Sequence, residues 1–440
     1  MNKQKMSFPI PNVTEHSERV KPRNHGYSRA ESPFYKLLHM QEPRAASTAI
    51  REQNLRAVLE ALRGRRPASR ADVALLTGLS KPTVGGALRS FEAAGLVREY
   101  GRTTGRRGPS ASLYDLVPDA VLVLGIDIGA RYVRAVLCDL DGEPVDEMTL
   151  QLTRPHADQV LESVRELGRR IAAVIDRTEL AVVGSPGVVD PATRRISAAP
   201  NIEGWEGVLA ENVLADALGL PARVDNDVNL AALGEQSAGA GRDVESFAYL
   251  NIGSGLGAGI VLHGRLHRGA RGAAGEVGFL PVGDDPFATS RREHGGAMEA
   301  RLSSHALVEV AERLAATTTS SLTAPFDVQS IFDAARTSDP LGRAVVAHTA
   351  REIAVCVAGL TSVLDLELVL LGGGIGINGD LLLPAVRTAT AQLVLPPPQI
   401  ECATLHERAV RIGAIAVGLE VTRGNVVRRL VRSQPTALER

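Results

Sequence analysis

Cysteine is scarce in this chain of 440 residues, which contains only Cys138, Cys356 and Cys402. The number is odd, the three lie far apart, and none belongs to a CxxC pair. This pattern excludes a disulfide framework and a zinc site built from cysteines. It is typical of a protein that stays in a reducing cytoplasm.

Long apolar segments are absent as well. The N-terminus lacks a basic start followed by an apolar core, so no signal peptide is predicted. The most apolar run, residues 353–364, is too short to span a membrane, and Asp365 and Glu367 follow it. We therefore expect a cytoplasmic protein.

Net charge is also nearly absent, because 49 Lys and Arg residues face 50 Asp and Glu residues. A value of −1 by itself argues against a nucleic-acid partner, but the charge is unevenly distributed. Residues 1–117 hold 20 basic and 10 acidic side chains, a net +10, and residues 118–440 hold 29 and 40, a net −11. Such asymmetry indicates a basic binding module joined to an acidic body.

The first 46 residues mix Lys, Arg, Asn, Ser and Pro without sustained periodicity. We interpret residues 1–46 as a disordered arm, which either touches DNA phosphates or is only a solvated tail.

Residues 47–117 carry the signals of three helices. Apolar residues at helical spacing predict a first helix that begins near residue 48. Ser69 caps a second helix, in which Asp72 completes a capping box, and that helix ends at Gly78. Ser80 caps a third helix that continues to about residue 94.

Two short strands, residues 96–100 and 113–116, flank a turn rich in glycine and arginine and complete a winged helix-turn-helix. The third helix of this fold lies in the major groove, and an arginine between glycines of the wing enters the minor groove. Gly85 and Gly86 each cost about 1 kcal/mol relative to Ala in a helix, so either DNA approaches closely there or the wing does most of the recognition. The alternative is a helical protein-interaction module with a solvated basic loop. The candidate DNA-contacting residues are Ser80, Lys81, Thr83, Arg89, Arg102, Arg106 and Arg107.

From residue 118 onward, strand-like and helix-like stretches alternate, which indicates an α/β architecture. Apolar strands are expected at residues 121–128 and 133–138. Three glycine clusters each follow an apolar strand, where glycine turns let backbone N–H groups approach phosphate oxygens. Any one such turn is common, but three predict two repeated lobes with a nucleotide or sugar cleft between them. The clusters comprise Asp127, Gly129, Gly253, Gly255, Gly257, Gly259, Gly372, Gly373 and Gly374.

A polar motif, Val-Asp-Asn-Asp-Val-Asn, occupies residues 224–229 ahead of a helical stretch. Its carboxylate Asp227 is suited to act as a general base toward a sugar hydroxyl if it lies in a cleft. The structural alternative is a helix N-cap or a turn residue, and spacing alone favours that alternative.

In order and combination, these stretches resemble the ROK family (repressors, open reading frames and sugar kinases) of the actin-like ATPase superfamily. The resemblance covers about residues 48–425 and implies a winged helix-turn-helix at 47–117. It further implies a two-lobed, ribonuclease H-like sugar-kinase fold at 118–425, with 426–440 left as a flexible tail. The motifs that carry it are GIDIGARYVRAVL, GSPGVVD, AAPNIEGW, VDNDVNLAALGE, NIGSGLGAGIVLHGRLHRGARGAAGEVG and LVLLGGGIG.

Carried over position by position, the resemblance makes Asp227 the counterpart of the catalytic base of the family's kinases. The glycine clusters then correspond to the family's phosphate and adenosine motifs. The positions that the resemblance assigns to sugar binding are Gly187, Asn201, Asn226, Asp227, Glu276 and Glu299.

The chain departs from the family pattern where a structural zinc ion is bound. Phe279 replaces a histidine that serves both zinc and sugar, and the motif CxCGxxGCxE corresponds to residues 290–299. Ser290, Arg292 and Ala297 replace its three cysteines. Because tetrahedral zinc needs four N or S ligands, we expect no metal here and a surface position for His294.

The first phosphate loop departs as well. The family pattern Asp-x-Gly-Gly-Thr is here Asp127-Ile128-Gly129-Ala130-Arg131. Ala130 adds a Cβ and Arg131 replaces the hydroxyl residue, so we expect a γ-phosphate to be held poorly and no ATP cofactor. Arg131 is instead a candidate for binding a phosphate that belongs to the effector.

The sequence thus predicts a sugar-responsive repressor of carbohydrate uptake or catabolism genes. It is expected to bind a palindromic operator as a homodimer or a dimer of dimers, and to be released by a sugar or sugar phosphate between the lobes. Asp227 is then a hydroxyl acceptor, and the protein is not an enzyme. The competing hypothesis is an ATP-dependent sugar kinase with a DNA-binding arm. A third is a regulator whose cleft, altered by Phe279, no longer binds a ligand.

Overall fold

A computed structural model describes residues 43–102, 110–285, 287 and 296–433. The predicted contacts of Arg106 and Arg107, and most of the expected arm, lie outside these residues. The arm was expected to end at residue 46, but the first helix begins at Pro43.

The N-terminal module is a winged helix, as predicted. Ser69 and Asp72 form the expected capping box, Gly78 ends the helix in the left-handed conformation, and the Ser80 hydroxyl accepts a hydrogen bond from the Thr83 amide. A two-residue strand that the sequence did not reveal joins the wing, giving an antiparallel sheet in the order β1-β3-β2. The elements are α2 (Pro43–Gly64), β1 (Ala68–Ser69), α3 (Arg70–Thr77), α4 (Lys81–Ala93), β2 (Val97–Arg102) and β3 (Ser112–Leu116).

Lobe 1 is a five-stranded sheet in the order β10-β7-β4-β5-β6. The strands β4, β5 and β6 are antiparallel, and β7 and β10 run parallel to β4. Helices α5 and α6 cover one face, on which Leu124, Ile126 and Trp205 are buried. The elements are β4 (Leu122–Ile128), β5 (Tyr132–Cys138), β6 (Pro144–Gln151), α5 (Ala157–Arg170), β7 (Thr178–Ser185), β8 (Val188–Val189), β9 (Ile196–Ser197), α6 (Ala210–Leu218) and β10 (Ala222–Asn226).

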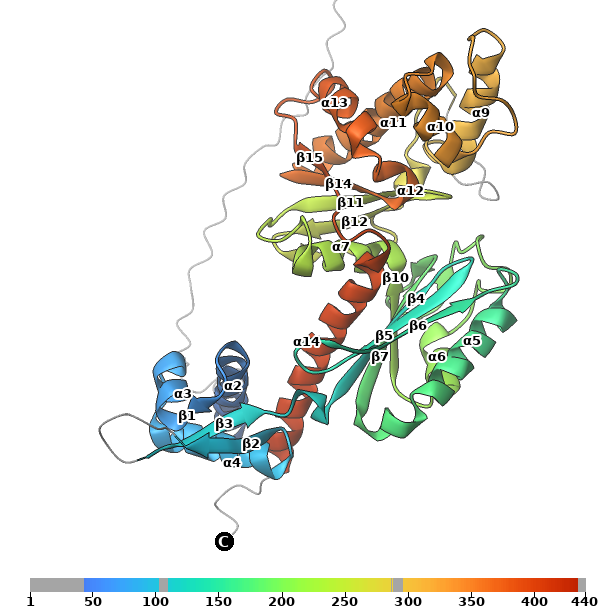
Figure 1. Cartoon of the computed structure of the whole chain (residues 1–440). Helices are drawn as coiled ribbons and strands as arrows, with labels where there is room; N and C mark the ends of the chain where they lie inside the picture. Colours follow the sequence, from blue (N-terminus) through green and yellow to red (C-terminus); the bar gives the residue numbers. More distant parts are fainter. Residues whose placement is uncertain (1–42, 103–109, 286, 288–295, 434–440) are drawn as a thin grey trace, which may run out of the picture. The chain divides into compact units, whose positions relative to one another are not determined.

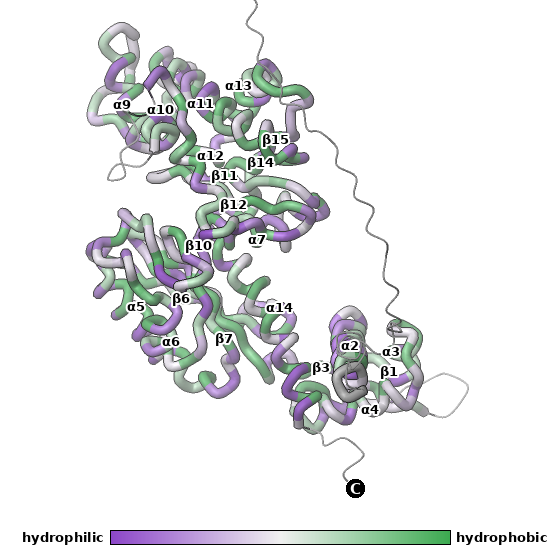
Figure 2. Tube along the Cα trace, turned by 180° about the vertical axis from the view of Figure 1, so that it is seen from behind, coloured by the Kyte–Doolittle hydropathy of each residue, from purple (hydrophilic) through white to green (hydrophobic). Residues whose placement is uncertain are grey.

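Lobe 2 repeats this topology, which confirms the two predicted lobes. Its order is β13-β12-β11-β14-β15, with β11, β12 and β13 antiparallel and β14 and β15 parallel to β11. Central strands of both sheets are apolar along most of their length (Figure 2). The elements are β11 (Phe247–Ile252), β12 (Leu256–Leu262), β13 (Arg265–Leu266), α9 (Ser304–Ala315), α10 (Val328–Arg336), α11 (Pro340–Leu364), β14 (Leu368–Gly372), α12 (Gly373–Gly376), α13 (Gly379–Thr390) and β15 (Gln399–Cys402).

Helix α11 is the one described helix that is long and apolar enough to cross a membrane by composition. Most of its apolar window is buried inside lobe 2, where Val345, Ile353 and Val357 belong to the core. Burial of this kind is typical of the core helix of a soluble protein.

Two helices, α7 (Asp227–Ala238) and α14 (Ala409–Arg432), pack against each other with very close backbones. A Cβ at Gly413 would lie 1.8 Å from the Leu230 carbonyl oxygen, and one at Gly234 would lie 2.2 Å from the Ala409 carbonyl oxygen. Helix α7 covers the inner face of the lobe 2 sheet, and α14 covers the second face of the lobe 1 sheet. Glycine is therefore required on both helices at their crossing.

The prediction of a flexible tail at residues 426–440 is wrong for its first half. Helix α14 continues to Arg432, and Val426, Val427 and Leu430 are buried in the core of the winged helix. The Arg423 side chain also donates to the Leu140 carbonyl oxygen over 2.7 Å. The end of the chain was misassigned because its apolar partners lie near the N-terminus, far away in sequence.

Candidate functional site

A cavity of about 310 Å³ lies between residues of lobe 1 and residues of lobe 2. Its lining includes all six positions that the sequence assigned to sugar binding: Gly187, Asn201, Asn226, Asp227, Glu276 and Glu299. Lobe 1 supplies Gly187 and Asn201 from loops after β7 and β9, and Asn226 from the end of β10, while α7 begins at Asp227. The segment after β13 and the turn before α9 supply the two glutamates. Residues spread over more than a hundred positions thus line one cavity.

The junction of β10 and α7 fixes the Asn226-Asp227 pair. Asn226 is the N-cap of α7, because its Oδ1 accepts a hydrogen bond from the Asn229 amide over 3.1 Å. Its Nδ2 donates to the Gly187 carbonyl oxygen over 3.1 Å, which ties the two lining segments together. The capping role considered for Asp227 therefore belongs to its neighbour, and the Asp227 carboxylate lines the cavity.

Burial raises the pKa values of the carboxyl groups in this region. It raises the pKa of Asp227 to about 7, and the nearby charge of Asp127 adds to the effect. Burial also raises the pKa of Asp127 to about 6, against the opposing charges of Arg134 and Arg411. The pKa of Glu276 is raised by burial and by the charge of Glu299. Raised carboxyl pKa values in a cavity favour hydrogen bonding to hydroxyl groups over binding of anions.

Glycines hold the segment that carries Glu276. A Cβ at Gly275, where φ is +94°, would lie 1.8 Å from the Ala258 carbonyl oxygen, and a Cβ at Gly272 would lie 2.3 Å from that of Val189. The segment therefore packs tightly on both lobes. Phe279 follows, lines the cavity and remains 43% exposed.

Two sets of contacts fix Glu299: a hydrogen bond to its own side chain, and an ion pair of the nearby Arg301. Its Oε2 accepts a hydrogen bond from the Leu256 amide over 2.9 Å, and burial raises its pKa despite that bond. Two residues later, Arg301 forms two hydrogen bonds with Glu352 of α11, at 2.8 and 2.7 Å. Glu352 is 7% exposed at its side chain. No local sequence pattern indicates this ion pair, because its members are 51 residues apart.

The family's zinc motif corresponds to residues 290–299, and the structure does not describe residues 290–295 of this stretch. No group of three or more His, Cys, Asp or Glu side chains suited to hold a metal occurs among the described residues. Ala297 and Met298 are buried instead of facing a metal site. The described part of the motif thus does not fit a zinc ion.

A second cavity, of about 530 Å³, adjoins the first and shares Asp227 with it. Arg134 of β5 enters this cavity, where its guanidinium lies 3.7 Å from Asp127 and 3.4 Å from Glu407. The sequence did not single out Arg134. Arg131, which it did single out as a phosphate ligand, is exposed and lines neither cavity.

The glycine clusters do not all form phosphate loops. Gly257 and Gly259 lie within β12, where a Cβ at Gly259 would lie 2.5 Å from the Val228 carbonyl oxygen of α7. Gly259 therefore serves helix packing, which corrects its assignment to a phosphate loop, whereas Gly257 lines the first cavity. Gly253 and Gly255 form a turn, since the Gly253 amide donates to the Gly255 carbonyl oxygen over 3.0 Å.

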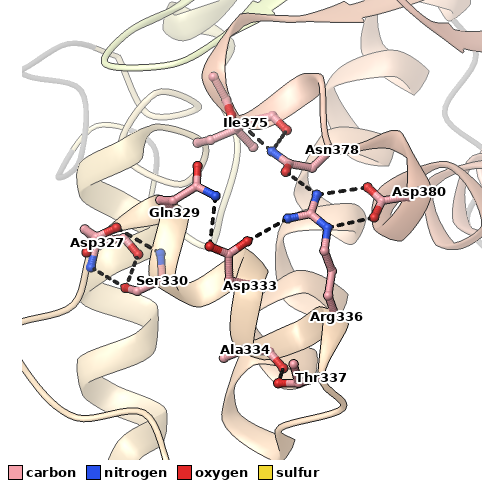
Figure 3. Close-up of polar contacts among 11 residues, drawn as sticks. Asp327, Gln329, Ser330, Asp333, Ala334, Arg336, Thr337, Ile375, Asn378 and Asp380 are labelled. Atoms are coloured by element: carbon pink, nitrogen blue, oxygen red, sulfur yellow. Dashed lines mark hydrogen bonds and ion pairs between the residues drawn. The ribbon is translucent and has the colours of Figure 1, made fainter.

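The third cluster opens α12 and is braced from α10 (Figure 3). Asn378 donates from Nδ2 to the carbonyl oxygens of Gly374 and Ile375. Arg336 donates to the Asn378 Oδ1 over 2.8 Å and makes two hydrogen bonds with Asp380. This network fixes the turn at one end of the second cavity.

The candidate DNA interface lies on α4. Ser80, Lys81 and Arg89 are exposed, Thr83 is half-buried, and Arg102 is exposed at the end of β2. A Cβ at Gly85 would meet its nearest neighbour at 3.6 Å, and a Cβ at Gly86 at 4.0 Å, both ordinary contacts. Packing within the chain therefore does not require either glycine.

Comparisons with known proteins agree with this arrangement. The profile of the IclR helix-turn-helix domain matches residues 54–100. The xylose repressor of Caldicellulosiruptor bescii is 27% identical over 84% of this chain and 96% of that protein. The glucokinase of Halalkalibacterium halodurans is 28% identical over 62% of this chain and 86% of that protein.

Solved structures show the same fold. A ROK family transcriptional regulator, a homologue of the E. coli MLC protein, superposes with a TM-score of 0.72 over 87% of this chain and all of that chain, at 24% identity. A ROK family glucokinase from Streptomyces griseus, in complex with glucose and AMPPNP, superposes with a TM-score of 0.58 over 68% of this chain and 99% of that chain, at 27% identity. The profile of the ROK family itself matches residues 123–420. The chain therefore belongs to the ROK family.

Proposed function

We propose that the protein is a sugar-responsive, DNA-binding transcriptional repressor of carbohydrate uptake or catabolism genes in the cytoplasm. The observation that carries the proposal is the combination of a winged helix with a cleft whose lining contains all six expected sugar-side residues. Similarity to xylose repressors over most of the chain supports it.

Helix α14 offers a path from the cleft region to DNA. His406, Glu407 and Val410, at and just before its start, line the cavity that shares Asp227 with the cleft. Its other end, at Val427 and Leu430, belongs to the winged-helix core. A sugar changes DNA affinity only if it binds two arrangements of the protein with different affinity. We propose that α14 shifts between such arrangements.

The cleft favours an uncharged sugar as the effector. Among the described residues, the ionisable groups of its lining are Glu206, Asp227, Glu276 and Glu299, with no Lys, Arg or His. Carboxylates accept hydrogen bonds from sugar hydroxyls, whereas they repel a phosphate or a uronic acid. We therefore propose a neutral sugar and set aside the sugar phosphate, for which Arg131 was the expected ligand.

The test measures binding of the full-length protein to DNA fragments that it selects from a random pool. Xylose, glucose and N-acetylglucosamine, each with its phosphate ester, are then added, and fluorescence anisotropy follows release. A neutral effector is expected to weaken DNA binding about 100-fold, a coupling of roughly 2.7 kcal/mol. Selected fragments are expected to be palindromic, with one half-site per subunit of a homodimer. Absence of any selected sequence would reject the repressor proposal.

A sugar kinase is the second candidate, because curated glucokinases are among the relatives. We propose that the chain is not an enzyme and uses neither ATP nor zinc. Support comes from the first phosphate loop, where Ala130 and Arg131 replace the family's glycine and threonine. In the zinc motif, Ser290, Arg292 and Ala297 replace its three cysteines. An ADP-release assay with the same sugars decides the matter. Turnover that the Asp227→Asn substitution abolishes would establish the kinase.

A further inference from the structure

A third cavity, of about 430 Å³, lies beside β10 at the edge of the lobe 1 sheet. Its apolar lining includes Val182 of β7, Val189 of β8 and Val417 of α14. Arg223 and Asp225 are two positions apart on β10, so their side chains lie on the same face of the sheet. Val182, the register partner of Arg223 on β7, also lies on this face. This face is the one that α14 covers.

Three guanidinium groups converge on this cavity from separate segments. Arg194 follows β8, Arg223 belongs to β10, and Arg268 follows β13 of lobe 2. Glu211 and Asp225 are the carboxylates in the lining. With three cations against two anions, the lined surface carries a net positive charge.

Two of the arginines are held by these carboxylates. Arg268 donates from Nε and Nη2 to the Asp225 Oδ2, at 3.0 and 2.5 Å. Arg194 donates from Nη2 to Glu211 and to the Val224 carbonyl oxygen. Arg194 keeps a left-handed φ of 57°, a conformation that is unfavourable for a residue with a Cβ. The site thus orders two guanidinium groups whose other N–H donors remain available.

The Arg223 side chain has no hydrogen bond or ion pair with any residue that the structure describes. It is the surplus cation of the cluster, and its five N–H donors lack a protein acceptor. Guanidinium groups bind phosphate through paired N–H donors, and a phosphate monoester carries between one and two negative charges at neutral pH. A carboxylate would satisfy fewer of these donors.

We propose that this cavity is a binding site for a phosphate monoester or for free phosphate, separate from the sugar cleft. Arg223 and Arg268 bind the phosphate oxygens, and the valine wall contacts the organic part of an ester. The site adjoins the sugar-binding motif, because the Asp225 Oδ1 accepts hydrogen bonds from the Asn226 amide and from Asn229. A phosphorylated metabolite bound here would act as a second ligand of the regulator.

The test is isothermal titration of the full-length protein with inorganic phosphate and, separately, with glycerol 3-phosphate, at ionic strength held constant with KCl. Saturable binding is expected, and tighter binding of the ester would identify an organic phosphate as the ligand. Arg223→Gln is expected to weaken binding about tenfold, the loss typical for a charged hydrogen bond. Arg165→Gln on α5, an exposed arginine that does not line this cavity, is the matched control and should bind like the wild type.

Arg223 has no protein partner to lose, so its variant is expected to fold, which a thermal melt verifies. Equal affinities of the wild type and Arg223→Gln would overturn the proposal and place the phosphate elsewhere, such as on the winged helix. Heat that does not saturate would overturn it as well. The measurement needs neither DNA nor sugar, so its result is independent of the proposed repressor function.

Discussion

Asp227 shows how a single residue depends on its surroundings. In sequence it is one of two aspartates of a short polar motif, and its spacing alone favours a capping or turn role over a chemical one. In the structure Asn226 caps α7, while the Asp227 carboxyl group lines the cavity near Asp127, with its pKa raised to about 7. The carboxyl group is therefore able to donate or accept a hydrogen bond near neutral pH.

This shift predicts an effect of pH on stability. The pKa of Asp227 rises from 3.8 to about 7 on folding, so between these values the folded state binds more protons than the unfolded state. The contribution of Asp227 to stability is therefore fully present below the unfolded pKa of 3.8, and it is lost as the pH rises through the folded pKa of about 7. The fall in Tm between about pH 5 and pH 8 should be smaller for Asp227→Asn than for the wild type. Asp216→Asn, which changes an exposed carboxylate of α6, is the control; identical pH profiles for the wild type and Asp227→Asn would contradict the assignment.

Arg301 is predicted to position Glu299 through its ion pair with Glu352. We expect Arg301→Gln to weaken sugar binding about fivefold, or about 1 kcal/mol, because the turn that carries Glu299 loses its anchor. Titration calorimetry with the effector sugar measures this, and Arg343→Gln on α11 is the control. Partial recovery in Arg301→Lys would distinguish the charge from the paired geometry. Unchanged sugar affinity would mean that the Leu256 amide alone holds Glu299.

At the scale of elements, α4 carries a pair of glycines that packing does not explain. Gly86 has room for a Cβ, so Gly86→Ala should raise the unfolding free energy by up to about 1 kcal/mol. If DNA approaches the helix there, the same substitution weakens operator binding. Denaturant unfolding and anisotropy titration together test this, with Ala94→Gly beyond the helix end as a control for backbone effects. Tighter or unchanged DNA binding would show that the wing does most of the recognition.

Residues 290–299 correspond to the motif in which the family places a zinc ion. Because serine, arginine and alanine replace its cysteines, removing metal ions is expected to change nothing. Dialysis against EDTA should leave Tm and sugar affinity unaltered, and elemental analysis should find less than one zinc per chain. A stoichiometric zinc ion whose removal lowers Tm would show that residues outside the described part supply ligands.

At the scale of the whole molecule, the end of the chain completes the DNA-binding module at its beginning. Leu430 of α14 is buried among α2 and the other winged-helix residues. We expect Leu430→Ala to cost about 2 kcal/mol of stability, because it leaves a cavity in a small core. Operator affinity should fall as well, whereas Arg432→Ala on the exposed side should change stability by less than about 0.5 kcal/mol. If Leu430→Ala were as stable as the wild type, the end of α14 would not contribute to the winged-helix core.

The wing makes a second prediction at this scale. Replacing Arg106 and Arg107 together should weaken operator binding and reduce the slope of log affinity against log salt by up to about two. A titration series in KCl measures the slope, with Arg165→Gln as the control for net charge. An unchanged slope would show that these two arginines do not contact phosphates.

The sequence by itself determined the kind of protein and most of its parts. Caps at Ser69 and Ser80 and the alternation of strands and helices depend on neighbouring residues, so local patterns were sufficient to predict them. The motifs around Asp227 and Glu276 were recognisable because they are contiguous. Only the tertiary structure decided contacts between distant segments: Arg134 with Glu407, Arg301 with Glu352, and α14 with the winged helix. Gly259 was misassigned for the same reason, because a glycine that lets a helix pack closely and a glycine that lets a phosphate approach can have the same local sequence. Which of the two it serves depends on the element that folds against it.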